Sequence, residues 1–144
     1  MANITLFAQV ISKIPRDLIK SVIRKYGTDK HAKGFNSWSH LISMIFCQFA
    51  DCVSLREISN GLKSATGNLN HLGIQRAPSK STLAYQNEHR DCEMFRECYY
   101  RLFQYFGQQG CFSQRKFRMK APVKLIDSTL ISLCMSLYDW ALYT

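Results

Sequence analysis

Apolar residues recur every three or four positions through most of the first 110 residues of this chain. This spacing places them on one face of an α-helix, whereas a half-buried strand alternates every second residue. The chain also contains only three prolines and seven glycines among its 144 residues, as a folded globular protein does. The pattern therefore predicts a domain of several helices at residues 1–112, long enough to have a core of its own.

Turn and capping residues predict where these helices begin and end. Pro15 suits the first position of a helix that Gly27 ends, and Ser37 is expected to cap the next helix, whose apolar interior should be buried. Ser54 and Glu57 have the spacing of a capping box. Ser79 or Ser81 is expected to cap a polar helix up to residue 90, and Asp91 the helix after it. The core-facing residues expected at the two ends of this region are Leu6, Phe7, Val10, Ile11 and Ile14, and Met94, Phe95, Cys98, Tyr99, Leu102, Phe103 and Phe106.

The character of the sequence changes at Ser113. A basic stretch follows, Pro122 interrupts any helix, and the residues after it are rich in valine, isoleucine and leucine. We expect a basic linker at residues 113–122 that tracks a nucleic-acid backbone, with a merely solubilising linker as the alternative. Its candidate DNA-binding residues are Arg115, Lys116, Arg118 and Lys120.

Asp127 is a single carboxylate within an apolar segment of strand character, Val123 to Leu133. An aspartate in such a strand is either a turn or hairpin residue or one ligand of a metal site. Metal-assisted phosphoryl chemistry needs two or three carboxylates that converge on the ions. On the residues alone, both interpretations of Asp127 stay open.

The chain carries a formal net charge of +9, with nineteen lysines and arginines against ten acidic residues. Such a surplus favours a polyanionic partner, because cations neutralise phosphates and release counterions. A basic surface that binds nothing is the alternative, and composition does not separate DNA from RNA or an anionic membrane.

The cysteines lack the paired spacing of a zinc site, and the four histidines are expected to be surface or capping residues. The most apolar tract contains Asp127 and Asp139, which argues against a membrane span, and no secretory signal opens the chain, so we expect a cytoplasmic protein.

Two predicted helices, one starting at Ser54 and one at Ser79 or Ser81, suggest a helix-turn-helix with an extended connection. Gln86, Asn87 and Arg90 in the second helix are the residue types that read base edges. Lys80, Ser81 and Thr82 at its start suit phosphate contacts, because free N–H groups at a helix N-terminus attract anions. An ordinary solvated helix is the alternative interpretation.

Several segments together resemble one family of proteins. They are Ser37-Trp38-Ser39-His40-Leu41, Ser54-Leu55-Arg56-Glu57-Ile58, His71-Leu72-Gly73, Ser81-Thr82-Leu83-Ala84 with Asn87 and Arg90-Asp91, and Ile126-Asp127-Ser128-Thr129. In order and spacing they resemble bacterial insertion-sequence transposases of the DDE type, in the group whose N-terminus is a small helical DNA-binding domain of otherwise uncharacterised label. The resemblance covers essentially the whole chain.

The resemblance implies a mainly α fold, in which a helical domain that binds the terminal inverted repeats of a mobile element precedes an RNase H-like α/β domain. In that second domain three carboxylates hold two metal ions, Mg²⁺ or Mn²⁺, that cleave and join DNA strands. Asp127 matches the first of these catalytic, metal-binding acids, and the other two have no counterpart in this sequence. We therefore expect residues 123–144 to be the start of a truncated RNase H-like domain, and we expect the chain alone to bind no metal and to lack strand-transfer activity.

The leading hypothesis is thus the DNA-binding N-terminal part of such a transposase. Its partners would be double-stranded DNA at the element ends, and a second copy of the chain or a full-length transposase. No membrane and no small-molecule substrate are expected. Two alternatives remain: a stand-alone DNA-binding regulator of transposition, and a basic helical protein-interaction module.

Overall fold

The computed structural model describes residues 4–65 and 69–111 of the protein. The chain divides into two units, residues 1–113 and 114–144, and every described residue belongs to the first. The described part is mainly helical and contains no strand, which confirms the predicted helical region. The predicted basic linker, the strand segment from residue 123 and Asp127 lie outside the described residues.

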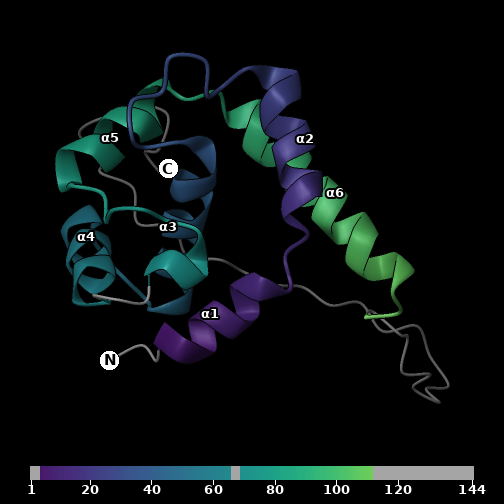
Figure 1. Ribbon diagram of the computed structural model, residues 1–144, viewed down its shortest axis with the longest axis horizontal. Helices are drawn as coiled ribbons and strands as arrows, with labels where there is room; N and C mark the ends of the chain where they lie inside the picture. Colours follow the sequence, from purple (N-terminus) through teal and green to yellow (C-terminus); the bar gives the residue numbers. More distant parts are fainter. Residues whose placement is uncertain (1–3, 66–68, 112–144) are drawn as a thin grey trace, which may run out of the picture. The chain divides into compact units, whose positions relative to one another are not determined.

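Six α-helices and one short 3₁₀ helix make up the described part (Figure 1). Along the chain they are α1 (Ile4–Ser12), α2 (Arg16–Tyr26), α3 (Ser37–Phe49), α4 (Leu55–Ser64), η1 (Leu69–Leu72), α5 (Lys80–His89) and α6 (Cys92–Gln108). None of these helices is long and apolar enough to cross a membrane.

Most of the predicted helix ends are confirmed. Gly27 ends α2 in the left-handed conformation, with φ of 61°, which glycine adopts without the steric cost of a side chain. The side chains of Ser54, Ser79 and Asp91 cap α4, α5 and α6 by accepting hydrogen bonds from backbone N–H groups of the first turn. Local capping chemistry therefore sets most helix boundaries.

The predicted cap of α3 is wrong by one residue. Asn36 is the N-cap, and its Oδ1 accepts a hydrogen bond from the Ser39 N–H at 2.8 Å. Ser37 is the first helical residue, and both its N–H (2.6 Å) and its hydroxyl (2.7 Å) donate to Asp29 Oδ1 in the preceding loop. The Ser37 hydroxyl thus donates to Asp29, and the side chains of Asp29 and Asn36 satisfy two of the free N–H groups at the start of α3.

The core of the described part lies where α3 packs against α1, α2 and α4. Its buried apolar residues are Phe7, Ile11, Ile19, Val22, Ile23, Phe35, Trp38, Ile42, Phe46, Ile58, Leu62, Leu72, Ile74, Leu83, Met94 and Cys98. The prediction that α1 and α6 turn broad apolar faces inward is wrong in part, because Leu6, Val10, Tyr99 and Phe103 are all at least 44% exposed. The fully buried residues are Phe7 and Ile11 in α1 and Met94 and Cys98 in α6, and Ala8, Phe95 and Leu102 are partly buried against the same core.

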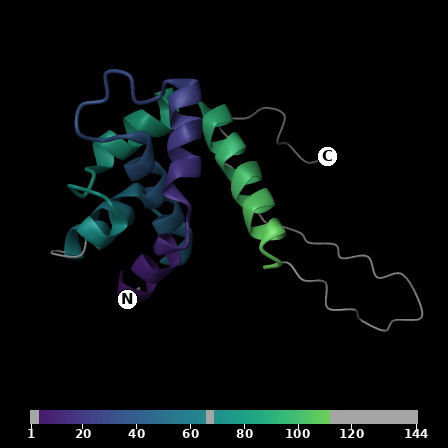
Figure 2. The ribbon, with the colours of Figure 1, turned by 45° about the vertical axis from the view of Figure 1, so that its right-hand side comes forward.

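Helices α2 and α6 lie side by side, as Figure 2 also shows. Glu97 of α6 joins them, since its carboxylate accepts hydrogen bonds from Lys25 of α2 at 2.6 Å and from Arg101 at 2.7 Å. Together with a hydrogen bond from Tyr26, the bond from Lys25 holds the pKa of Glu97 at about 2. The carboxylate therefore stays ionised through the ordinary pH range and fixes α6 to α2.

Gly61 lies where α4 crosses α3. A Cβ atom at this position would come within 2.7 Å of Cε1 of Phe46, a core residue that is only 3% exposed. Glycine weakens a helix interior by about 1 kcal/mol relative to alanine. The close approach of α4 to the Phe46 ring accounts for a glycine at this point.

We expect Gly61→Ala to lower the free energy of unfolding by about 1–3 kcal/mol, because the added methyl group overpacks the core against Phe46. Urea denaturation followed by circular dichroism measures this change. Asn60→Ala, at the exposed neighbouring position of α4, is the control and should change stability by less than about 0.5 kcal/mol. A stabilised Gly61→Ala variant would show that helix propensity outweighs packing and that α4 does not approach Phe46 this closely.

Candidate nucleic-acid interface

Helices α4 and α5 contact each other, and residues 65–79 connect them. This connection includes η1 and is much longer than the three or four residues usual in a helix-turn-helix. Its last part is fixed to α4, because the buried Ser59 hydroxyl donates to the Pro78 carbonyl at 2.8 Å. The start of α5 is therefore held at a defined place beside α4 despite the long connection.

The N-terminus of α5 presents hydroxyl and N–H groups to solvent. The Ser79 Oγ accepts a hydrogen bond from the Thr82 N–H at 3.1 Å and lies within 2.9 Å of the Ser81 Oγ. The Leu83 N–H is the first in the helix to bond a backbone carbonyl, that of Ser79. The N–H groups of Lys80 and Ser81 precede it and remain available to an anion, at the positive end of the helix dipole. The predicted phosphate contacts Lys80, Ser81 and Thr82 all lie here.

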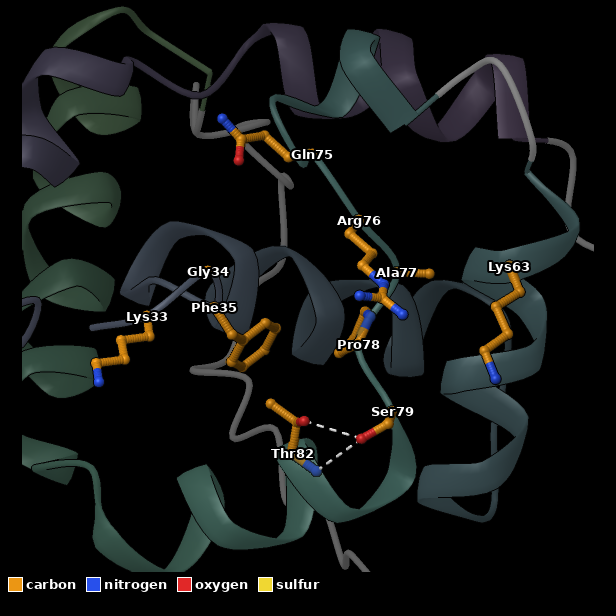
Figure 3. A pocket seen from close by; sticks show the side chains of 10 residues that line it. All are labelled: Lys33, Gly34, Phe35, Lys63, Gln75, Arg76, Ala77, Pro78, Ser79 and Thr82. Carbon is orange, nitrogen blue, oxygen red and sulfur yellow. Dashed lines mark hydrogen bonds between the residues drawn. The ribbon is translucent and has the colours of Figure 1, made fainter.

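A pocket of about 470 Å³ opens beside this N-terminus (Figure 3). Three cations line it: Lys33 of the loop after α2, Lys63 of α4 and Arg76 of the connection. The other lining residues include Phe35, Pro78, the α5 N-cap Ser79 and Thr82 of α5. No carboxylate lines this pocket, and none of the three cations makes a hydrogen bond or ion pair with a described residue. The pocket is therefore a concentration of unneutralised positive charge.

Two of the three predicted base-reading residues make contacts inside the protein. Asn87 Oδ1 accepts a hydrogen bond from His40 Nε2 of α3 at 2.6 Å. Arg90 donates to the Phe35 carbonyl at 3.2 Å, its guanidinium carbon lies 5.9 Å from the Phe35 ring centroid, and burial lowers the pKa of the guanidinium. The third, Gln86, is half-buried, and its side chain makes no hydrogen bond to a described residue.

Helical spacing explains where these side chains point. Leu83 is buried, and Asn87 follows it four residues later on the same face of α5, while Arg90 is the C-cap that ends the helix. The face turned to solvent carries Ser81, Tyr85 and Glu88 instead. The four-residue spacing from buried Leu83 was the signal that the Asn87 side chain would reach His40, although Asn87 is itself exposed.

His40 is buried, at 2% exposure, which corrects the expectation of surface or capping histidines at this position. Its ring lies between Phe95 (centroids 5.0 Å apart) and Phe35 (5.7 Å). Since Asn87 Oδ1 only accepts, Nε2 carries the proton of the neutral ring, and the buried Nδ1 has no hydrogen-bond partner. Burial lowers the pKa of His40, and the nearby charge of Arg90 acts in the same direction while the bond to Asn87 opposes it.

Sequence reasoning missed the three pocket cations. Lys33, Lys63 and Arg76 come from separate segments and belong to no run or helical pattern. Only the packing of the loop, α4 and the connection brings them to one place. Among the described residues, no group of three histidine, cysteine or acidic side chains is arranged to hold a metal ion.

One family model matches this chain. It is described as a domain of unknown function, DUF4372, and it matches residues 2–75. The matched segment contains α1 to η1, with Lys33 and Lys63, and ends just before Arg76 and α5. No curated protein and no solved structure matches the chain.

We expect Asn87→Ala to lower the free energy of unfolding by about 1–3 kcal/mol, because His40 Nε2 would lose its partner while buried. Thermal or urea unfolding measures the loss. Gln86→Ala, at the preceding position of the same helix, should cost no more than about 0.5 kcal/mol. Equal stability of the two variants would contradict an internal role for Asn87.

The folded protein should lose stability as the pH falls below about 6.5, the ordinary pKa of histidine. Because the folded pKa of His40 lies below that value, the unfolded chain binds the proton first and is favoured as the pH falls. Urea unfolding between neutral and mildly acidic pH measures this dependence. The His40→Gln variant keeps a side-chain N–H donor but does not titrate, so it should lose less stability as the pH falls. If its stability falls with pH as steeply as that of the unsubstituted chain, His40 is not the source of the pH dependence.

Proposed function

We propose that this chain, which belongs to the DUF4372 family, binds double-stranded DNA through its helical unit. The target we propose is the end of a mobile element, and the role is that of the DNA-binding part of an insertion-sequence transposase. The observation that carries the DNA-binding proposal is the placement of the α5 N-terminus beside a pocket lined by three unneutralised cations.

The electrostatics of the chain support this proposal. A helix N-terminus with free N–H groups attracts phosphate, and Lys80 and Ser81 supply such groups at the start of α5. Lys33, Lys63 and Arg76 add positive charge at the same place, in a chain of net charge +9. Phosphate contacts of this kind give a DNA-binding protein most of its affinity and fix its orientation on the duplex.

The arrangement of α5 suggests how sequence would be read. A helix-turn-helix places the first residues of its second helix against base edges in the major groove. Helix α5 turns Ser81, Tyr85 and Glu88 outward, with Gln86 at the border of that face. In this proposal Gln86 and the outward residues lie nearest the bases, while Asn87 and Arg90 orient the helix through His40 and Phe35.

The transposase role rests on the sequence resemblance, which includes Asp127, and it remains a proposal. In a two-metal site, paired Mg²⁺ or Mn²⁺ ions would supply the strand-transfer chemistry. No step of the DNA-binding proposal depends on that site. A regulator that occupies element ends would use the same surface, whereas a protein-interaction module would not need the cationic pocket.

Binding to a fluorescently labelled duplex of random sequence, measured by anisotropy at a series of salt concentrations, tests DNA binding. We expect the logarithm of the binding constant to fall linearly with the logarithm of the salt concentration, by about 0.9 for each phosphate neutralised. Undetectable binding at low salt, or an affinity independent of salt, would overturn the proposal.

Sequence recognition needs a separate experiment. Repeated selection from a pool of duplexes with randomised centres should enrich one shared sequence, which Gln86→Ala or Tyr85→Ala then binds less selectively. Enrichment of no sequence would contradict base reading by α5 and would leave only non-specific binding to the DNA backbone.

A further inference from the structure

We propose that the pocket beside the α5 N-terminus is a binding site for the sugar–phosphate backbone of one DNA strand. Lys33 and Lys63 would contact phosphate oxygens at opposite ends of the pocket, and Arg76 would contact one between them. This inference rests on the proposed function. It adds three cations that the sequence analysis did not single out, and one of them, Lys33, comes from outside the segment formed by α4, the connection and α5.

The chemistry of the lining selects an anion. Besides the three cations, the pocket contains no carboxylate. The hydroxyl groups of Ser79 and Thr82 also line it; they bond to each other at 2.8 Å, and the one that accepts in that bond keeps its proton for a phosphate oxygen. A second pocket, lined in part by residues of α2, differs because carboxylates are among its lining residues. There Asp17 and Asp29 accompany the cations, and Asp17 forms an ion pair with Lys20 at 3.8 Å.

The shape of the pocket selects an extended anion. Lys33 and Lys63 extend at opposite ends of it in Figure 3, and Arg76 extends between them over Pro78. Its volume of about 470 Å³ is many times the roughly 30 Å³ that one water molecule occupies in the liquid. A length of backbone with successive phosphates matches separated cations better than one small phosphate ion does.

The pocket walls are fixed before any ligand binds. The Pro78 carbonyl is bonded to the buried Ser59 hydroxyl at 2.8 Å, and the Phe35 carbonyl to Arg90 at 3.2 Å. These contacts hold the connection against α4 and the loop after α2 against the end of α5. A preformed site loses less conformational entropy on binding, so the segments that carry the three cations need little further ordering, and only the exposed cationic side chains are ordered by the ligand.

Single substitutions in the full chain test this site: Arg76→Gln, Lys63→Gln and Lys33→Gln. Each should weaken binding of duplex DNA several-fold at low salt and reduce the salt slope by about 1, equally for selected and random sequences. All three residues are exposed, so the melting temperature should not change. Three separate variants keep the test valid if one of them fails to fold.

Arg96→Gln and Lys13→Gln are matched controls that remove the same charge elsewhere. Arg96 lies on α6, where it pairs with Glu93 at 2.9 Å, and Lys13 follows α1. If the controls weaken binding and lower the salt slope as much as the pocket variants do, the pocket proposal is overturned while DNA binding stands. If the unsubstituted chain does not bind duplex DNA, the proposed function itself fails.

An RNA duplex of the same sequence serves as a competitor, because phosphate chemistry is common to both nucleic acids. We expect the DNA duplex to bind more tightly and the pocket variants to lose that binding. Tighter binding of the RNA duplex would overturn the assignment of DNA as the ligand.

Discussion

The first turn of α3 is bonded to three segments that lie far from it or from one another in the sequence. Ser37 donates to Asp29 in the loop after α2, the Trp38 indole N–H donates to the Leu72 carbonyl at 2.9 Å, and His40 donates to Asn87 of α5. All three side chains are buried, so each bond satisfies polar groups that water does not reach. The positions of the loop, the connection and α5 depend on these bonds.

The proposed interface follows from that arrangement. The loop carries Lys33, the connection carries Arg76, and α5 contributes its N-terminus, so the segments held by α3 are those that surround the pocket. Lys63 reaches it from α4, which packs closely on α3 because Gly61 admits the Phe46 ring. A buried polar network thus brings dispersed basic residues together around one pocket, the proposed site for an anionic ligand. The same network bonds Asn87 to His40, and Arg90 to the Phe35 carbonyl, at the C-terminal part of α5.

The sequence predicted those helix ends that depend on residues within a single helix turn. The caps Ser54, Ser79 and Asp91 and the left-handed Gly27 were predictable because each acts within its own helix turn. The cap of α3 was misplaced by one residue, because Asn36 and Ser37 are both capping residue types and the bond from Ser37 to Asp29, which decides between them, depends on tertiary packing. Periodicity likewise indicated the apolar residues of α1 and α6 but not which neighbours would cover them, so Leu6 and Tyr99 were wrongly expected inside. Nothing in the sequence around Lys33, Lys63 or Arg76 indicated that these three residues line one pocket.

Amide chemical-shift mapping by NMR, with and without a DNA duplex, tests the central claim most directly. If DNA binds where α5 begins, the largest shifts should occur at the N–H groups of Lys80 and Ser81, in the loop around Lys33 and at Arg76. Smaller shifts are expected along the exposed face of α6. The largest shifts on α6 or α1, with the amides around the pocket unchanged, would contradict the account.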